Sequence, residues 1–188
     1  MFIDYLTLML VNMVAGLCIL AAYLWKGMDE SDQAKWAAAF AMPGFVALVC
    51  GLHMTCTWPL PGSFNSAYGE LSVLFGVLFA GAAVALAKGW DLLPVALYAP
   101  FAGLASLVIG VRFVDLGLSN APLMTGAGFV LTGLAGLFAA PTIYFKSSRA
   151  LRAVGVLVLL AAAAVWALTG YVSFWMHMET FANWAPAS

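Results

Sequence analysis

The sequence predicts an all-α membrane protein, a six-helix bundle that forms a single transmembrane domain over residues 1–188. Three observations lead to this fold class. The chain is 65% hydrophobic and only 8% charged, whereas a soluble domain has about 25% charged residues. Six stretches are apolar over the roughly 20 residues that a helix needs to cross a bilayer. Six of the seven Lys and Arg residues lie in three short gaps between those stretches.

The first three expected helices run over residues 5–25, 36–56 and 69–87. The chain start lacks the basic segment of a signal peptide, so we expect the first helix to be retained. Pro59, Pro61 and Gly62 lie between the second and third helices. These residues favour turns and exclude a continuous helix, so we expect two separate spans there.

The last three expected helices run over residues 92–113, 123–145 and 153–175. Pro94, Pro100 and Pro141 lie within or near them. Each proline removes a backbone donor, so we expect kinks at these positions. Because the number of spans is even, the two termini should lie on the same side of the membrane.

The basic residues indicate which side that is. The three gaps hold Lys26 and Lys35, then Lys88, then Lys146, Arg149 and Arg152. Loops rich in Lys and Arg stay on the cytoplasmic side of a membrane. We therefore expect a protein of the plasma (inner) membrane whose N- and C-termini are periplasmic or extracellular. The net charge of −1 gives no reason to expect a nucleic-acid partner. The expected partner is the lipid bilayer.

Stripes of small residues follow helical spacing in three of the spans. They comprise Gly76, Ala80, Ala83 and Ala87, then Ala99, Gly103, Ser106 and Gly110, then Thr132, Gly136 and Ala140. Small residues at such intervals let helices approach closely in lipid. The same pattern also fits a narrow lumen or contacts between subunits, and the sequence leaves these interpretations open.

Polar side chains inside a bilayer are costly, so they are the first candidates for function. Trp166, Thr169, Ser173 and His177 share one face of the last helix. Asn12 lies in the outer half of the first helix. The sequence therefore predicts that these side chains line a pore.

Near the outer surface, His53 ends the second helix and Glu70 opens the third. Together with His177 they are predicted to form an outer vestibule whose charge changes with pH, because histidine titrates near neutrality. Arg112 and Asp115, three residues apart, are expected to form an ion pair.

A metal or haem site is the alternative role for these residues. His53 and His177 are candidate axial haem ligands. Met54, Cys56, Met176 and Met178 lie beside the imidazoles and are soft ligands that suit copper. Glu70 or Asp115 is a candidate carboxylate ligand for zinc or iron. No metal-binding motif is present, so no cofactor is predicted and haem b or copper remains the alternative. The other interpretation is that both histidines only form hydrogen bonds at the membrane surface.

One segment resembles the amide and urea channel family. Its residues are Tyr68–Gly69, Leu74–Phe75–Gly76, the run from Lys88 to Pro94, and Tyr98. The resemblance implies six spans with both termini outside, a ring of identical subunits, and a narrow pore in each protomer for urea, short amides or ammonia. Asn12 resembles a polar position in the first helix of that family. The last helix here offers Thr169, Ser173 and His177 where the family has a carboxylate. Leu92 and Leu93 follow Asp91 where the family has an arginine.

The segments Gly51–Met54 and Trp58–Gly62 also resemble a family of uncharacterised bacterial and archaeal multi-span membrane proteins. That resemblance implies no activity.

The sequence therefore predicts a homo-oligomeric channel or facilitator for a small neutral solute of the urea, short amide or ammonia class. Two alternatives stay open, namely a haem- or copper-binding redox protein and an accessory subunit of a larger membrane complex. Catalysis is the least favoured class, because the sequence does not bring a nucleophile and a base together.

Overall fold

A computed structural model describes residues 5–185 of the chain, and this part consists of helices and their connections. The α-helices are α1 (Leu6–Trp25), α2 (Ala37–Thr57), α3 (Leu71–Lys88), α4 (Leu93–Ala96), α5 (Ala99–Leu116), α6 (Pro122–Tyr144) and α7 (Arg149–Thr180). A π-helical segment, Asn65–Glu70, leads directly into α3. Within residues 5–185, six helical segments are long and apolar enough to cross a membrane, which confirms the predicted all-α class with six spans.

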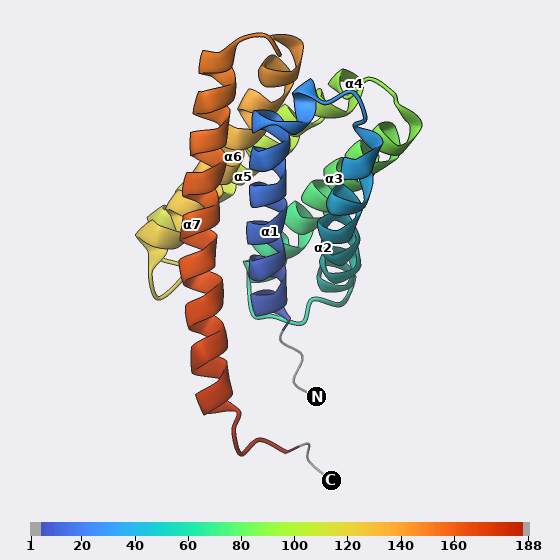
Figure 1. The fold of residues 1–188 in the computed structure, drawn as a ribbon. Helices are drawn as coiled ribbons and strands as arrows, with labels where there is room; N and C mark the ends of the chain where they lie inside the picture. The colour runs from blue at the N-terminus through green and yellow to red at the C-terminus, as the bar shows by residue number, and fades with distance from the viewer. Residues whose placement is uncertain (1–4, 186–188) are drawn as a thin grey trace.

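The helices pack as three antiparallel pairs. Figure 1 shows α1 beside α7 and α2 beside α3, while α5 and α6 cross behind them at a steep angle. Additional contacts join α6 to α7 and α1 to α2, whereas α3 meets α5 only sparsely. The bundle core therefore lies where the three pairs face one another.

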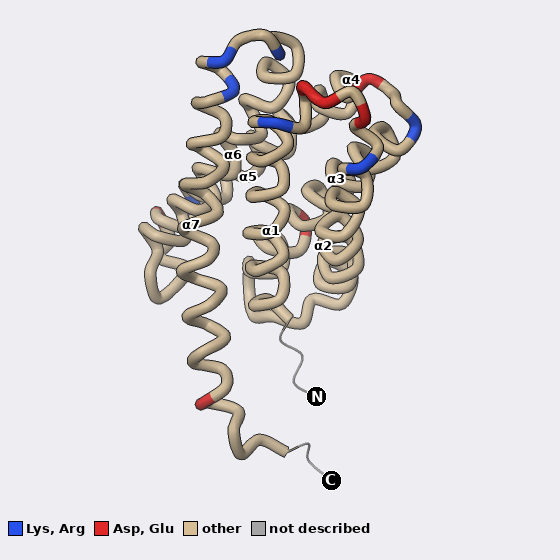
Figure 2. Tube along the Cα trace, in the orientation of Figure 1, with Lys and Arg blue, Asp and Glu red and all other residues tan. Residues whose placement is uncertain are grey.

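The start of α1 and the end of α7 lie at one end of the bundle, and most Lys and Arg residues lie at the opposite end (Figure 2). The acidic residues of the connection after α1 lie with the basic ones. This gathering of charged residues at one end is the arrangement expected from the three basic gaps. Below, "basic end" means the end of the bundle that holds the connections after α1, α3 and α6, and "terminal end" means the other.

Two helix pairs meet through glycine. A Cβ at Gly103 of α5 would lie 2.6 Å from the carbonyl oxygen of Gly133, and one at Gly110 would lie 2.9 Å from that of Gly126. In the other pair, a Cβ at Gly76 of α3 would lie 2.8 Å from the backbone nitrogen of Leu48. These distances are too short for any side chain, so the packing interpretation of the small-residue stripes is confirmed at these positions.

Three spans differ from the sequence expectation in their extent. The third begins earlier, at the π-helical segment, because buried Asn65 holds the preceding turn through hydrogen bonds with Leu60 and Gly62. The fourth is interrupted between α4 and α5, just before Pro100, which lacks the backbone donor needed to continue the helix. The sixth is a single helix of 32 residues, well beyond the expected 153–175.

The additional length of α7 has a local cause. Ser148 accepts a hydrogen bond from the backbone nitrogen of Leu151, so this side-chain cap starts the helix at Arg149, four residues before the apolar run begins. At about 1.5 Å per residue α7 is about 48 Å long, and it reaches farther than α1 at the terminal end. Counting apolar residues misses these polar ends.

Candidate functional site

A cavity of about 170 Å³ lies between the helices of the bundle. Side chains from α1, α2, α3, α5, α6 and α7 line it, together with α4. It extends along α1 from Met9 to Leu24, which corresponds to about 22 Å along the helix axis. None of the lining residues is charged. The candidate site is therefore a long, narrow and mainly apolar space within the membrane-spanning part of the protein.

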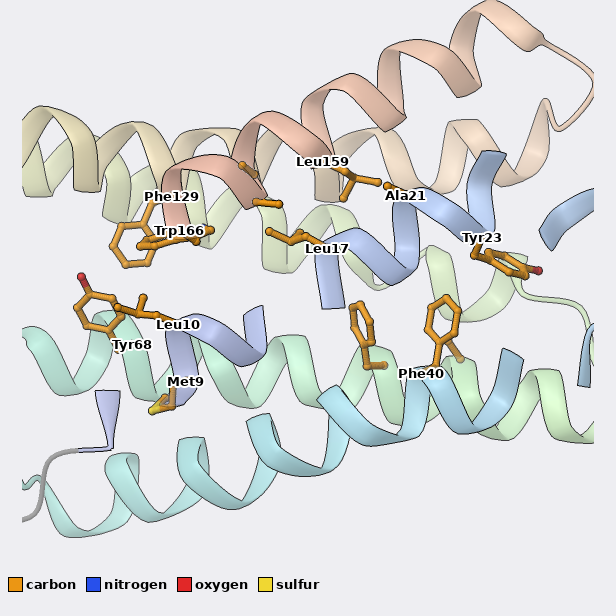
Figure 3. Packing of buried hydrophobic residues seen from close by; sticks show 14 of the residues in the cluster. Met9, Leu10, Leu17, Ala21, Tyr23, Phe40, Tyr68, Phe129, Leu159 and Trp166 are labelled. Carbon is orange, nitrogen blue, oxygen red and sulfur yellow. The ribbon is translucent and has the colours of Figure 1, made fainter. Parts of the chain in front are cut away.

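Aromatic side chains form the cavity wall toward the terminal end. Trp166 of α7 is 2% exposed and lies edge-on to Phe129 of α6, with their ring centroids 5.0 Å apart. Tyr68 contacts both rings, with centroid distances of 5.3 Å to Phe129 and 6.4 Å to Trp166. Figure 3 shows these three side chains grouped together, with Tyr23 and Phe40 farther along the core. Gly128 makes this cluster possible, because a Cβ there would lie 2.9 Å from the indole of Trp166.

Most polar groups of the wall already have partners within the protein. The Trp166 indole nitrogen donates to the Thr132 hydroxyl at 2.9 Å, and that hydroxyl donates to the carbonyl of Gly128 at 2.8 Å. The hydroxyl of Ser106 donates to the carbonyl of Phe129 at 2.7 Å. These three side chains thus have little hydrogen-bonding capacity left for an occupant of the cavity.

Thr142 differs from these residues. Its side chain lies in the cavity wall toward the basic end, it is 0% exposed, and its hydroxyl has no hydrogen-bond partner among the described residues. Gly155 of α7 also lines the cavity there. A Cβ at Gly155 would lie 3.6 Å from the Thr142 oxygen and 3.8 Å from Leu24. Unlike the glycines of the helix seams, Gly155 could carry a Cβ at ordinary contact distance from this polar atom.

Arg152, one turn before Gly155 on α7, holds the basic end of the bundle together. Its guanidinium donates to both carboxylate oxygens of Asp29, at 2.9 and 2.8 Å. It also donates to the carbonyls of Leu24 and Trp25 at 2.7 and 2.9 Å, and to that of Lys146 at 3.5 Å. These five hydrogen bonds match the five N–H groups of a guanidinium. Arg152 therefore caps the last carbonyls of α1 with its charge fully compensated.

Two carboxylates of the same connection, Asp29 and Glu30, are stabilised in their charged forms. Hydrogen bonds from Arg152 hold the pKa of Asp29 below its ordinary value. The Trp36 indole nitrogen donates to Glu30 at 2.6 Å and Lys35 pairs with the same carboxylate at 3.0 Å, and these contacts lower the pKa of Glu30. The Asp29–Arg152 pair thus joins the connection to α7, and the Glu30–Lys35 pair holds the connection together.

Among the residues predicted to line a pore, Trp166 is the one that lines the cavity. Asn12 instead donates to the carbonyl of Pro43 at 2.9 Å and joins α1 to α2. The Thr169 hydroxyl bonds to the carbonyl of Val165 in its own helix at 3.0 Å, and Ser173 is partly buried outside the cavity wall. Of the polar face predicted for the last helix, Trp166 lines this cavity, whereas Thr169, Ser173 and His177 do not.

The two histidines bind to the first turn of α1. The Tyr5 hydroxyl lies 2.7 Å from Nδ1 of His53, and the Thr7 hydroxyl lies 3.2 Å from Nδ1 of His177. His177 belongs to α7 and His53 to α2, and these two helices flank α1 in Figure 1. The imidazoles thus lie on opposite sides of α1.

The other candidate metal ligands are dispersed. Met54 is 1% exposed and packs against Gly69, whereas Cys56, Met176 and Met178 are exposed. In the part of the chain that the structure describes, no three His, Cys, Asp or Glu side chains come together as a metal site. Glu70 is exposed, and Arg112 pairs with Asp115 at the end of α5.

Sequence reasoning missed Thr142, Gly155 and the clamp role of Arg152. Arg152 was placed correctly as one of the basic residues, but its burial depends on the position of α1, which is 127 residues away in sequence. A threonine in an apolar helix gives no signal by itself, because most such hydroxyls bond to their own backbone. The stripe of small residues in the fourth expected helix pointed to part of the cavity wall. Ala99, Gly103 and Ser106 of this stripe line the cavity as well as packing against α6.

A family model described as "Protein of unknown function (DUF981)" matches residues 1–180, so the chain belongs to this family. No curated protein and no solved structure matches the chain. The match agrees with the resemblance to multi-span membrane proteins without a known activity, and it gives no support to the amide and urea channel family.

Proposed function

We propose that this member of the DUF981 family binds a small, uncharged and mainly apolar molecule in the cavity between its membrane helices. The observation that carries the proposal is the cavity itself, about 170 Å³ in volume and without a charged residue in its wall. An engineered protein cavity of about 150 Å³ with an apolar lining stays dry and binds benzene or xenon. A space of this size and chemistry favours an apolar occupant over water.

The polarity of the wall excludes a strongly polar occupant. A polar molecule that leaves water needs replacement hydrogen bonds, and each one that is missing costs on the order of 1–3 kcal/mol. Ser106, Thr132 and Trp166 already use their hydrogen-bonding groups within the protein. Urea or a short amide would therefore lose more than it gains in this cavity, whereas a hydrocarbon-like molecule would not.

Passage of a small neutral solute is the second candidate function. It is favoured by the length of the cavity, which follows α1 from Met9 to Leu24. Ammonia is the member of the predicted solute class that fits best, since it has the fewest hydrogen bonds to replace. Proteoliposomes loaded with a pH indicator and exposed to an ammonia gradient test this function, and a rate no higher than that of empty vesicles contradicts it.

Photolabelling tests the binding proposal directly. The purified protein in detergent is irradiated with trifluoromethyl-phenyl-diazirine, a small apolar probe, and labelled residues are mapped by mass spectrometry. Lipid-facing side chains should be labelled in every sample. Lining residues such as Phe129 should be labelled only if the probe enters the cavity.

Two variants of α6 provide the matched comparison. Ala135→Phe places a ring in the cavity wall, whereas Ala127→Phe places the same ring on an exposed position of the same helix. We expect labelling of lining residues in the wild type and in A127F but not in A135F. Ala139→Leu, another lining position, provides a smaller substitution should A135F fold poorly. Absence of label from lining residues in the wild type contradicts the proposal.

A further inference from the structure

One fully buried hydroxyl of the cavity wall has no hydrogen-bond partner among the described residues. The Thr142 hydroxyl is buried, lines the cavity and has no hydrogen-bond partner among the described residues. A buried hydroxyl without a partner costs on the order of 1–3 kcal/mol. Such a group is unfavourable in the empty protein and becomes favourable when a ligand supplies the missing partner.

The space beside this hydroxyl has room for one more carbon atom at ordinary contact distance. Gly155 faces it from α7, and a Cβ at this position would have only two neighbouring atoms within 4 Å, the Thr142 oxygen and Leu24 Cδ1. Every Cβ built on Gly103, Gly110 or Gly133 would instead meet another atom at 2.9 Å or less. The glycine at 155 therefore does not serve close helix packing, and it leaves room for an atom that contacts Thr142.

The charge next to this space is already compensated. Arg152 lies one turn from Gly155, but its five N–H groups are all used by Asp29 and by backbone carbonyls. Arg152 is also absent from the cavity wall. A negatively charged head group would thus find no free cation, and a positively charged one would find no anion among the lining residues.

We propose that Thr142 and Gly155 form a subsite for the single uncharged polar group of an amphiphilic ligand, a hydroxyl or a carbonyl. The apolar part of the ligand then extends toward Phe129 and Trp166. This inference rests on the proposed binding function and adds the polarity and the orientation of the ligand: polar group toward the basic end, hydrocarbon toward the terminal end.

Competition between two simple probes tests the subsite. Hexanol and hexane are titrated against diazirine labelling of the cavity wall, and the concentration that halves the labelling is measured for each. We expect Thr142→Val to raise this concentration five- to tenfold for hexanol, which corresponds to loss of one hydrogen bond, and to leave it unchanged for hexane. Thr169→Val is the control, because that hydroxyl bonds within α7 and lies outside the cavity wall.

A second variant addresses the space rather than the hydroxyl. Gly155→Ala introduces a Cβ at ordinary contact distances, so the protein should fold, and the Cβ should weaken hexanol binding by occupying the space beside the hydroxyl. The stability of the empty protein gives an independent result. Thr142→Val should leave the thermal unfolding temperature unchanged or raise it, because it removes an unpaired polar group.

The possible outcomes separate the subsite from the cavity. Equal weakening of hexane and hexanol by T142V, or no change in either, overturns the subsite while the binding function stands. A clear loss of thermal stability in ligand-free T142V also overturns it, because the hydroxyl must then have a partner in the protein. Failure of both probes to protect the wild type overturns the binding function and the subsite together.

Discussion

Arg152 on α7 and Asp29 after α1 form a two-fold hydrogen-bonded ion pair in which the guanidinium side chain is 8% exposed and the carboxylate 67% exposed. The cation is thus buried against the end of α1 while its counter-ion faces solvent. This asymmetry makes the pair a clamp between the first and last helices of the bundle, and it closes the basic end near the cavity.

Replacing the buried cation should destabilise the protein. Arg152→Gln removes the charged donors to Asp29 and to the carbonyls of Leu24 and Trp25, and we expect a loss of about 2 kcal/mol in the free energy of unfolding. Arg149→Gln, at an exposed position of the same helix turn, should change it by less than about 0.5 kcal/mol. Reversible unfolding in mixed micelles measures both, and equal effects of the two substitutions contradict the clamp.

The glycine seam between α5 and α6 makes a second prediction. Gly103→Ala places a Cβ 2.6 Å from the Gly133 carbonyl, and separating two helix backbones should cost about 1–3 kcal/mol. Gly81→Ala is the control, because the nearest atom to its Cβ is a Val95 methyl at 3.4 Å and alanine favours helix. The same unfolding measurement should show G81A to be neutral or slightly stabilised. A stable G103A would show that this seam is looser than described.

The histidines provide a prediction that distinguishes hydrogen bonding from a shared metal or haem. Because His53 and His177 bind opposite sides of α1 through Tyr5 and Thr7, the effects of His53→Ala and His177→Ala on stability should add within about 0.5 kcal/mol. A double-mutant cycle measures the coupling. A coupling energy well above that value, together with a visible absorption band lost in either variant, would support the haem or copper hypothesis instead.

The orientation of the bundle in the membrane is predicted by its basic end. With Cys18, Cys50 and Cys56 replaced by alanine, Asn183→Cys should react with an impermeant maleimide added to intact cells. Arg149→Cys should react only after the membrane is permeabilised. The reverse pattern would place the basic connections outside and invert the topology inferred from the charges.

The sequence was sufficient for those properties that depend on local composition. Six apolar runs and three basic gaps predicted the spans and the end at which the charges gather, because both depend only on residues near each other in the chain. The i, i+3 ion pair of Arg112 and Asp115 is predictable for the same reason. The break before Pro100 and the cap at Ser148 also depend on neighbouring residues, but counting the apolar residues in a stretch does not reveal them.

The cavity was not predictable, because it depends on which helix faces meet. Trp166 was expected in a polar face with Thr169 and Ser173, yet it is buried between Phe129 and Tyr68 while the other two lie outside the cavity wall. Thr142 became a candidate only when α7 was seen to place Gly155 beside it. These contacts are between residues of different helices, so they cannot be predicted from the spacing of residues along one helix.

The central claim is that the space between the helices holds an amphiphilic molecule in one orientation. Crystals of the wild-type protein soaked with bromohexanol, in which the bromine is on the carbon farthest from the hydroxyl, give the most direct test. The account predicts an anomalous bromine peak inside the cavity toward Phe129 and Trp166, with the alcohol oxygen within hydrogen-bonding distance of Thr142. Bromine found only on the lipid-facing surface, or an empty cavity at saturating probe, would contradict it.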